Sequence, residues 1–285
     1  MSVTLRPGRR EDADACGVIG FEAFKSISSQ HDFPWDFPSA EVATDLMKML
    51  LSNAGFYSVV AELDGQIVGS NFLDTRNPIF GIGPISVAPT AQNHGIGRRL
   101  MLDVIEYSAR RGVAGVRLLQ AAYHNRSLCL YTKLGFDSRE PVSKLDGTPL
   151  GNRQPGYPVR PAIPDDLAAC NALCRKVHGH ERGGELRDAI DQGTARLVEH
   201  LGRITGYATE IAFFGHAVAE TNRDLQALIG AAPGFEGGGF LVPTRNGELF
   251  RWCLQNGLRL VHQMTLMTTG LYNEPAGAYL PSVLC

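Results

Sequence analysis

Two short sequence patterns occur twice in this chain, in the same order, and they constrain its fold more than any other feature. Residues 5–16 and 159–170 share an apolar-Arg-Pro start, then an Asp and a Cys at matching places. Further along, residues 65–70 resemble residues 202–207. Two matches in one order favour a duplicated unit over chance similarity between common strand and turn sequences. A chain of 285 residues is long enough for two units that each bury a core.

The segment between the repeats has the composition of a linker. Residues 145–158 contain three prolines and three glycines and show no sustained hydrophobic periodicity. We therefore predict a first domain over residues 1–147, a linker over 148–158 and a second domain over 159–285.

Within the first unit, hydrophobic periodicity predicts alternating helices and strands. The predicted helices cover residues 12–24, 40–51, 97–111 and 127–134, and the predicted strands cover 57–63, 66–74, 80–87, 113–121 and 136–145, the last closing the unit. Asp64-Gly65 is the signal for a tight hairpin between the first two of these strands. This order predicts a mixed α/β fold and not a doubly wound parallel sheet.

Composition excludes several classes of partner. A net charge of −2 gives no reason to expect a nucleic-acid or membrane-surface partner, which would normally leave a basic stripe. The apolar stretch 211–219 is too short to span a bilayer, and the N-terminus lacks a secretory signal, so we expect a cytoplasmic protein. The six cysteines show no metal-type spacing, so no metal site is expected; Cys170 and Cys174 fit one buried helix face.

The stretch most informative about chemistry runs from residue 85 to residue 99, where a strand leads through a loop with two glycines into an amphipathic helix. The first turn of a helix has free backbone N–H groups and partial positive charge, and glycine lets an anion approach closely. This geometry suits a pyrophosphate, with Arg98 and Arg99 beside it. A dinucleotide fingerprint is excluded because Leu100 stands where a third Gly or Ala is needed, and the Gly-Lys-Ser/Thr of a P-loop is absent.

The hexapeptide at residues 92–97, Gln-Asn-His-Gly-Ile-Gly, resembles the Gln/Arg-x-x-Gly-x-Gly/Ala signature of the GCN5-related N-acetyltransferase (GNAT) family. Residues 125–136 are similar to a second family segment, Asn…Leu-Tyr-x-Lys-x-Gly-Phe. The resemblance covers about residues 3–145. It implies an α/β chain of two tandem GNAT-like domains, the first with an acetyl-CoA site and the second degenerate.

The resemblance also implies roles for individual residues. Ile85, Ser86 and Val87 would pair with the pantetheine arm of acetyl-CoA on a strand that splays from its neighbour; Gln92, Asn93, His94, Gly95, Ile96, Gly97 and Arg98 would wrap the pyrophosphate; Asn125 would help to hold the arm; Tyr131 would protonate the departing thiolate. A phenol with a pKa near ~10 can donate a proton to a thiolate of similar basicity.

Several of these residues also have a structural interpretation. Tyr131 could be a core aromatic residue of an amphipathic helix, and Asn125 could cap the helix that follows it. Arg99 lies on the predicted water-facing side, where a solvated surface charge is expected.

The general base is a weak point of the resemblance. Many family members have a glutamate on the strand that corresponds to residues 80–87, and this chain has no acid there. Asp74, His124 and the acidic loop 31–36 are candidates, and each also fits a surface or capping role. Phe33, Trp35 and Phe37 around Asp36 would form either the wall of an acceptor site or a hydrophobic lid.

The second half lacks a Gln/Arg-x-x-Gly-x-Gly helix start, so no second cofactor site is expected. Gly237–Gly239 is interpreted as a flexible turn before a strand at 240–242, with an anion nest as the alternative. This half would complete the acceptor cleft, form a homodimer interface or buttress the first domain.

The leading functional hypothesis is an enzyme that transfers an acetyl group from acetyl-CoA to an amine of a small molecule or peptide by direct attack. The first alternative is a non-catalytic acyl-CoA-binding or sensor protein without a working base. The second is an interaction protein with neither activity.

Overall fold

The computed structural model describes residues 3–284, and its elements follow one another in the same order in the two halves. The first half contains β1 (Val3–Pro7), α1 (Ala13–Gln30), α2 (Ala40–Ser52), β2 (Phe56–Leu63), β3 (Gln66–Asp74), β4 (Ile79–Val87), α3 (Ile96–Arg110), β5 (Gly115–Ala121), α4 (Asn125–Lys133) and β6 (Asp137–Asp146). The second contains β7 (Val159–Pro161), α5 (Leu167–His178), α6 (Gly183–Asp191), β8 (Arg196–His200), β9 (Arg203–Ala208), β10 (Ala217–Ala219), α7 (Asn222–Ala231), β11 (Phe240–Pro243), α8 (Gly247–Gln255), β12 (Arg259–Gly270) and β13 (Ala278–Leu280). The order from β7 to β12 repeats the order from β1 to β6, which supports the predicted duplication.

The repeated sequence pattern corresponds to the same ion-pair arrangement in both halves. Arg6 donates to the two carboxylate oxygens of Asp12 at 2.7 and 2.9 Å and to Glu62 at 2.7 Å. In the second half the same contacts join Arg160 to Asp166 at 2.7 and 2.9 Å and to Glu199 at 2.9 Å. A bidentate arginine–carboxylate contact fixes the relative orientation of its two side chains. Each arginine therefore holds the first strand of its half against the start of the first helix and against the hairpin.

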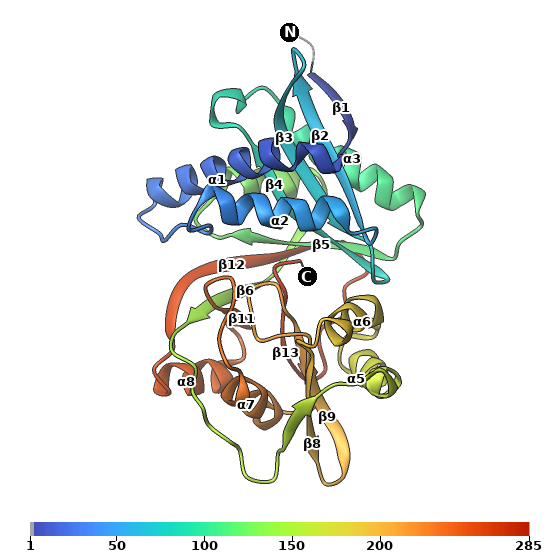
Figure 1. Ribbon diagram of the computed structural model, residues 1–285, viewed down its shortest axis with the longest axis vertical. Helices are drawn as coiled ribbons and strands as arrows, with labels where there is room; N and C mark the ends of the chain where they lie inside the picture. Colours follow the sequence, from blue (N-terminus) through green and yellow to red (C-terminus); the bar gives the residue numbers. More distant parts are fainter. Residues whose placement is uncertain (1–2, 285) are drawn as a thin grey trace.

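The two halves exchange strands. The larger sheet has eight strands in the order β1-β2-β3-β4-β5-β12-β6-β11, and the smaller has five in the order β13-β10-β9-β8-β7. Strand β12 of the second half therefore lies between β5 and β6 of the first, and Figure 1 shows it running beneath β5. The prediction that residues 136–145 close the first unit is wrong, because β6 lies between β12 and β11. The boundaries at 147 and 159 stay a prediction, and the larger sheet crosses them.

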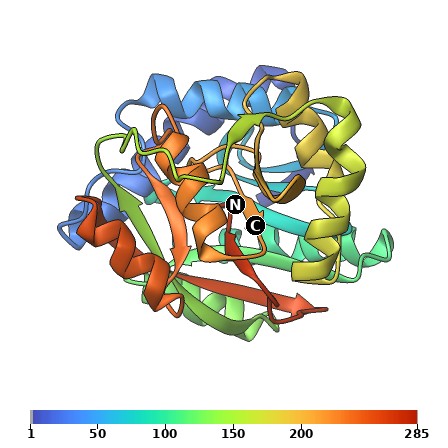
Figure 2. The same cartoon turned by 90° about the horizontal axis from the view of Figure 1, so that it is seen from below.

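Helices cover both faces of the larger sheet. Figure 1 shows α1 and α2 on one face and α3 on the other. The apolar stripe predicted for α3 packs on the sheet, with Leu100, Met101 and Val104 fully buried. In the second half, α5 and α6 lie on the opposite side from α8 in the view from below (Figure 2). All neighbouring strands in the described residues are antiparallel except β4 and β5, so the predicted mixed α/β fold is confirmed.

Local signals in the sequence correspond to the structure. Asp64 and Gly65 have φ of 51° and 79°, the left-handed conformations that a tight hairpin turn requires. Residues 147–158 form neither helix nor strand, as expected for a linker. Cys170 and Cys174 are both buried on α5.

Two absences apply to residues 3–284. No helix in this range is long and apolar enough to cross a membrane. No group of three or more His, Cys, Asp and Glu side chains in the same range is arranged to hold a metal ion.

Candidate active site

Strands β4 and β5 run parallel for a short distance and then separate. Their pairing covers only Ile79–Gly81 against Gly115–Arg117. On its other edge β4 still pairs with β3 up to Val87. The β5-facing edge of β4 is therefore unpaired over its last residues, which include Ile85, Ser86 and Val87. This is the splay that the family resemblance implied, and it leaves backbone groups for an extended ligand arm.

The loop after β4 is held against the strand by its own glutamine. The Gln92 side-chain amide donates to the Val87 carbonyl at 3.1 Å. Asn93 and Gly95 have φ of 69° and 77°, and this left-handed backbone turns the chain into α3. Gly95 is the N-cap of α3, and no side chain caps this helix start. The first-turn N–H groups therefore stay available to an anion, in the positive field of the helix dipole.

Gly97 keeps space open at this helix start. A Cβ atom there would come no closer than 3.8 Å to Leu130 and 3.9 Å to Val87, which is ordinary contact. Packing within the protein therefore does not require glycine at this position. The space lies between the start of α3, the end of β4 and α4, where a phosphate chain would meet the free N–H groups.

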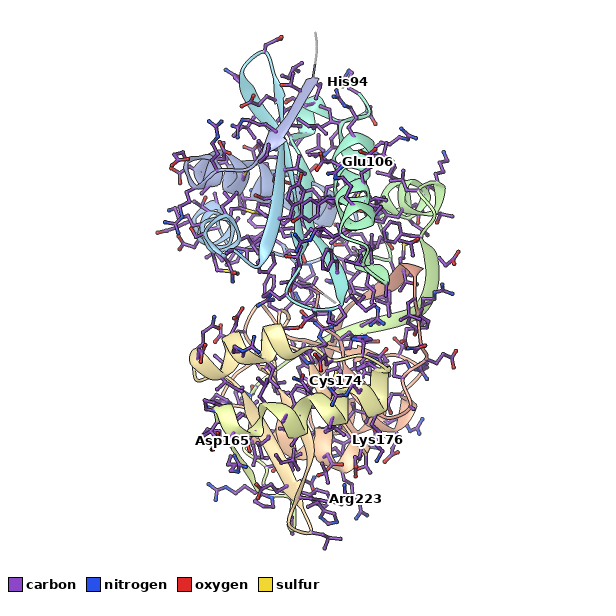
Figure 3. All side chains as sticks on the ribbon, turned by 90° about the vertical axis from the view of Figure 1, so that its right-hand side faces the viewer. His94, Glu106, Asp165, Cys174, Lys176 and Arg223 are labelled. Carbon is purple, nitrogen blue, oxygen red and sulfur yellow. The ribbon has the colours of Figure 1, made fainter. Side chains whose placement is uncertain are left out.

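The charged side chains at the helix start differ in availability. Arg99 donates to the Val3 carbonyl at 2.6 Å, which ties it to β1. Arg98 is exposed and makes no such contact among the described residues. Asn93 and His94 are exposed on the loop, and Figure 3 shows His94 at one end of the molecule. The residues present thus fit a pyrophosphate, with Arg98 as the free positive side chain.

Tyr131 lies on α4 in the core beneath this opening. Its ring packs edge-on against Phe136, with 6.4 Å between ring centroids. Burial raises the pKa of the Tyr131 phenol, so the hydroxyl keeps its proton at neutral pH. The packing agrees with the core-aromatic interpretation, and the retained proton is what a general acid needs.

Asn125 does not cap α4, which corrects the capping interpretation. The N-cap residue is His124, and no side chain makes a capping hydrogen bond there. Asn125 is the first helical residue and is exposed. Its amide makes no side-chain hydrogen bond within residues 3–284, so it is free to bind a ligand.

The predicted candidates for the general base occupy different environments. Asp74 is buried and accepts from the Arg76 guanidinium at 2.9 Å, which gives it a structural role. His124 is half-buried, and burial, then Arg126 and His31, lower the pKa of its imidazole. Asp36 is half-buried, and burial raises the pKa of its carboxyl.

The aromatic residues of the loop 31–37 do not form one wall. Trp35 packs edge-on against Phe21, and Phe37 against Phe24, so both fasten the loop to α1. Phe33 instead stacks on Tyr123, with 4.5 Å between ring centroids. Phe33 and His31, whose ring lies 5.4 Å from that of Tyr123, are thus the aromatic residues of this loop that reach the end of β5.

Phe33 belongs to a cluster that sequence reasoning missed. This group, the His262 cluster, consists of Phe33, Asp36, Tyr123, Lys144 and His262. Lys144 comes from β6 and His262 from β12 of the second half. Period-2 alternation assigns such residues to strands but does not show which strands pair, so Lys144 and His262 gave no local signal of a shared site.

The corresponding helix start in the second half is closed. Thr221 caps α7 by accepting from the Asp224 backbone N–H, and Asp224 accepts from the Thr221 N–H at 3.0 Å. A hollow of about 460 Å³ lies beside it, but two carboxylates, Glu220 and Glu248, line that hollow. Arg245 lines the same hollow, so the capped start of α7 is the observation that supports the prediction of a degenerate site.

The glycine-rich segment of the second half forms a turn. Gly237 and Gly238 both have φ of 71°, and Gly239 leads directly into β11. A Cβ atom at Gly239 would lie 2.1 Å from the Leu145 carbonyl oxygen. Close packing against β6, and not a helix start, explains the glycine at that position.

A mixed sheet that opens between β4 and β5, with a glycine-started helix beside the opening, defines the acyl-CoA N-acyltransferase fold. Residues 22–136 match the family model described as the Acetyltransferase (GNAT) family. This match lies within the first half of the chain, and the repeated order of elements gives the second half the same type of fold.

Comparisons with individual proteins agree with this assignment. The mycothiol acetyltransferase of Amycolatopsis mediterranei is 28% identical over 146 residues, which are 48% of this chain and 46% of the relative. The match thus spans about half the length of that curated relative.

Two solved structures resemble the whole chain. One, from Pyrococcus horikoshii, aligns with 97% of this chain over 92% of its own length, with a TM-score of 0.76 and 20% identity. The GCN5-related N-acetyltransferase from Sphaerobacter thermophilus covers 95% and 96%, with a TM-score of 0.64 and 16% identity. At these identities the likeness shows a shared fold over both halves.

Proposed function

We propose that this protein is an N-acetyltransferase that moves an acetyl group from acetyl-CoA to an amine of a small molecule or peptide. The observation that carries the proposal is the separation of β4 from β5 beside the uncapped start of α3. The family match over residues 22–136 supports the choice of an acetyl donor. A cytoplasmic location accords with the proposal and stays an expectation.

Each part of the opening has a task in binding the donor. The unpaired edge of β4 at Ile85–Val87 would hold the extended arm through backbone hydrogen bonds. The loop from Gln92 to Arg98 would hold the phosphates through first-turn N–H groups and the Arg98 guanidinium. The free amide of Asn125 would bind the arm from the α4 side.

Acetyl-CoA supplies an activated acetyl thioester, and the protein must manage the protons of its transfer. The sulfur leaves as a thiolate that needs a proton, and we assign this donation to Tyr131. Burial keeps the phenol protonated, and a thiolate that develops in the same desolvated surroundings is made more basic by the same effect, so it can take this proton. Because the amine attacks directly, no covalent enzyme intermediate is needed.

The test of the proposal is calorimetric titration of acetyl-CoA, followed by thiol release across a panel of amines. We expect one binding site per chain and amine-dependent release of CoA. Two sites would mean that the second half also binds the donor. No binding at all would rule out the proposal.

The alternative of a non-catalytic acyl-CoA sensor rests on one observation: β4, Ile79–Val87, contains no acid to serve as a base. The thiol-release panel separates the two functions. Acetyl-CoA binding without thiol release for any amine would favour the sensor.

A further inference from the structure

Four segments from both halves meet at the carboxyl end of β5 and form the His262 cluster. Phe33 comes from the α1–α2 loop, Tyr123 follows β5, Lys144 lies on β6 and His262 on β12. The His262 ring lies edge-on to Phe33 and to Tyr123, at centroid distances of 6.0 and 5.7 Å. The cluster sits where β5 ends beside the opening between β4 and β5.

A bulge in β12 directs His262 toward Lys144. Leu260 pairs with Leu145 and His262 pairs with Lys144, so Val261 is an extra residue on β12. A bulge of this kind re-aims side chains and is common beside active sites. As cross-strand partners, His262 and Lys144 lie next to each other on one face of the sheet.

Both side chains are buried, and neither makes a hydrogen bond within residues 3–284. His262 is 3% exposed, and its Nδ1 is buried with no hydrogen-bond partner. Lys144 is 4% exposed; its ammonium lies 4.2 Å from the Phe213 ring centroid and makes no ion pair within residues 3–284. Buried donors and acceptors left in this state mark a place where a ligand or water completes the hydrogen bonding.

Asp36 adds the opposite charge on the loop side of the cluster. It interacts electrostatically with Lys144, but the two do not form an ion pair. Ser28 lies 3.5 Å from the Asp36 carboxylate and 3.4 Å from the Tyr123 hydroxyl, which orders this side. A positive and a negative group that face each other without touching suit a ligand that carries both charges.

We infer that the His262 cluster is the acceptor site, that it takes an amino acid or a similar small amine with a carboxylate, and that His262 accepts the proton of the amine. Lys144 binds the acceptor carboxylate, and Asp36 attracts its ammonium. The inference rests on the proposed acetyl transfer. It makes the second half a contributor to the reaction, because β12 supplies His262.

The proton balance of the reaction is complete. The acceptor ammonium first loses a proton to His262, which passes it to solvent. The nitrogen–carbon bond then forms and the carbon–sulfur bond breaks, while Tyr131 gives its proton to the thiolate. The second proton lost by the nitrogen replaces the one that Tyr131 gave, so the enzyme returns to its starting state.

Without an acceptor, the surroundings of His262 keep its imidazole neutral and only weakly basic. Burial, and then Lys144, lower the pKa of the His262 imidazole to about 4, so it is neutral at physiological pH. Tyr123 faces the ring as a neutral phenol, because burial raises its pKa. A carboxylate bound at Lys144 would offset the ammonium and make His262 a stronger base when the acceptor is present.

The experiment compares the common amino acids with their carboxamides as acceptors, by thiol release from acetyl-CoA. We expect at least one acid to react with a KM about tenfold or more below that of its amide, the usual size of a charge-assisted contact. Lys144→Met should remove this preference while acetyl-CoA affinity stays unchanged. Lys176→Met on the distant α5 is the matched control and should keep the preference.

The role of His262 needs a separate variant. His262→Gln should lower kcat about 100-fold and leave KM for the acid and acetyl-CoA affinity nearly unchanged. His200→Gln, at the end of β8, is the matched control. Unchanged kcat in His262→Gln would remove this residue from the reaction.

A measurement without turnover tests the arrangement itself. NMR titration of the histidine rings should show that His262 stays neutral down to about pH 4. Lys144→Met should raise the pKa of His262. Addition of the preferred acid to the CoA-loaded protein should also raise it, whereas the amide should not.

Three outcomes would overturn the inference. The first is equal use of acids and amides, and the second is no reaction or binding of any acid. The third is a His262 pKa that changes neither in Lys144→Met nor on addition of the acid. Retained acetyl-CoA binding in such a case would leave the proposed donor site standing. Absent acetyl-CoA binding in the unmodified protein would instead defeat the proposed function.

Discussion

The helix starts of α3 and α7 occupy equivalent places in the two halves and have opposite character. At α3 the N-cap is Gly95, and no side chain caps the helix. At α7 the N-cap is Thr221, and Asp224 completes a reciprocal capping box. Figure 3 labels His94 and Arg223, which mark these two helix starts at opposite ends of the molecule.

Position by position, the difference explains why one start suits an anion. Two residues after the N-cap, the first half has Gly97 and the second half has Arg223. One residue further, the first half has Arg98 and the second half has Asp224. The capping box satisfies the N–H groups that α3 leaves free, and it places a buried carboxylate where a phosphate would lie. Stabilising the helix start and binding an anion there are thus competing uses of the same N–H groups.

The largest effect should come from a negative side chain at the open start. Gly97→Glu should weaken acetyl-CoA binding by about 1000-fold or more, because like charges placed together cost several kcal/mol. The matched variant Arg223→Glu in α7 should leave binding unchanged. Calorimetric titration measures both, and retained affinity in Gly97→Glu would show that the site is misplaced.

The next effect concerns the proposed proton donor. Tyr131→Phe should lower kcat about 100-fold with nearly unchanged acetyl-CoA affinity, since only the hydroxyl is lost. The seventh residue of α8 is Cys253, which is the counterpart of Tyr131 in α4. Cys253→Ala should therefore leave kcat unaltered in steady-state assays, and a full rate for Tyr131→Phe would restrict Tyr131 to packing.

A smaller effect tests what the halves share. Asp12→Asn and Asp166→Asn should each reduce the free energy of unfolding by about 1.5 kcal/mol, the scale of partly exposed charge-assisted hydrogen bonds. The arginine partners lower the pKa of both carboxyls below the ordinary 3.8. Their contribution is therefore present above about pH 4 and is lost as pH falls through the folded-state pKa.

Urea unfolding at pH 7 and pH 3 measures this effect. The variants should differ from the unmodified protein at pH 7 and approach it at pH 3. Clearly unequal losses of unfolding free energy in Asp12→Asn and Asp166→Asn would mean that the duplicated ion pairs do not stabilise the two halves equally.

The smallest effect separates the two arginines of α3. Arg98→Ala should weaken acetyl-CoA binding about fivefold, as expected for one partly solvated charge contact. Arg99→Ala should change it less than twofold, since Arg99 already binds the Val3 carbonyl. A reversed order of the two affinities would exchange their roles.

Much of the fold could be predicted from the sequence because the relevant signals are local. The Asp64-Gly65 turn, the α3 stripe and the glycine helix start each depend on residues within one or two turns of chain. The position of β12 between β5 and β6 could not, because Leu266 pairs with Leu119 across a long stretch of sequence and any apolar strand satisfies the same pattern.

The candidate site divides in the same way. The donor side, from Ile85 to Arg98, lies in one continuous segment with a recognisable spacing. The His262 cluster depends on which strands pair, so Lys144 and His262 carried no signal of their own.

The insertion of β12 also has a consequence for biosynthesis. As the chain leaves the ribosome, β5 and β6 emerge well before residues 259–270, which must lie between them. Until then β5 lacks its neighbour on one edge and β6 lacks its neighbours on both, and open strand edges are prone to pair with other chains. We therefore expect a protein cut at the linker to aggregate instead of folding as a smaller enzyme.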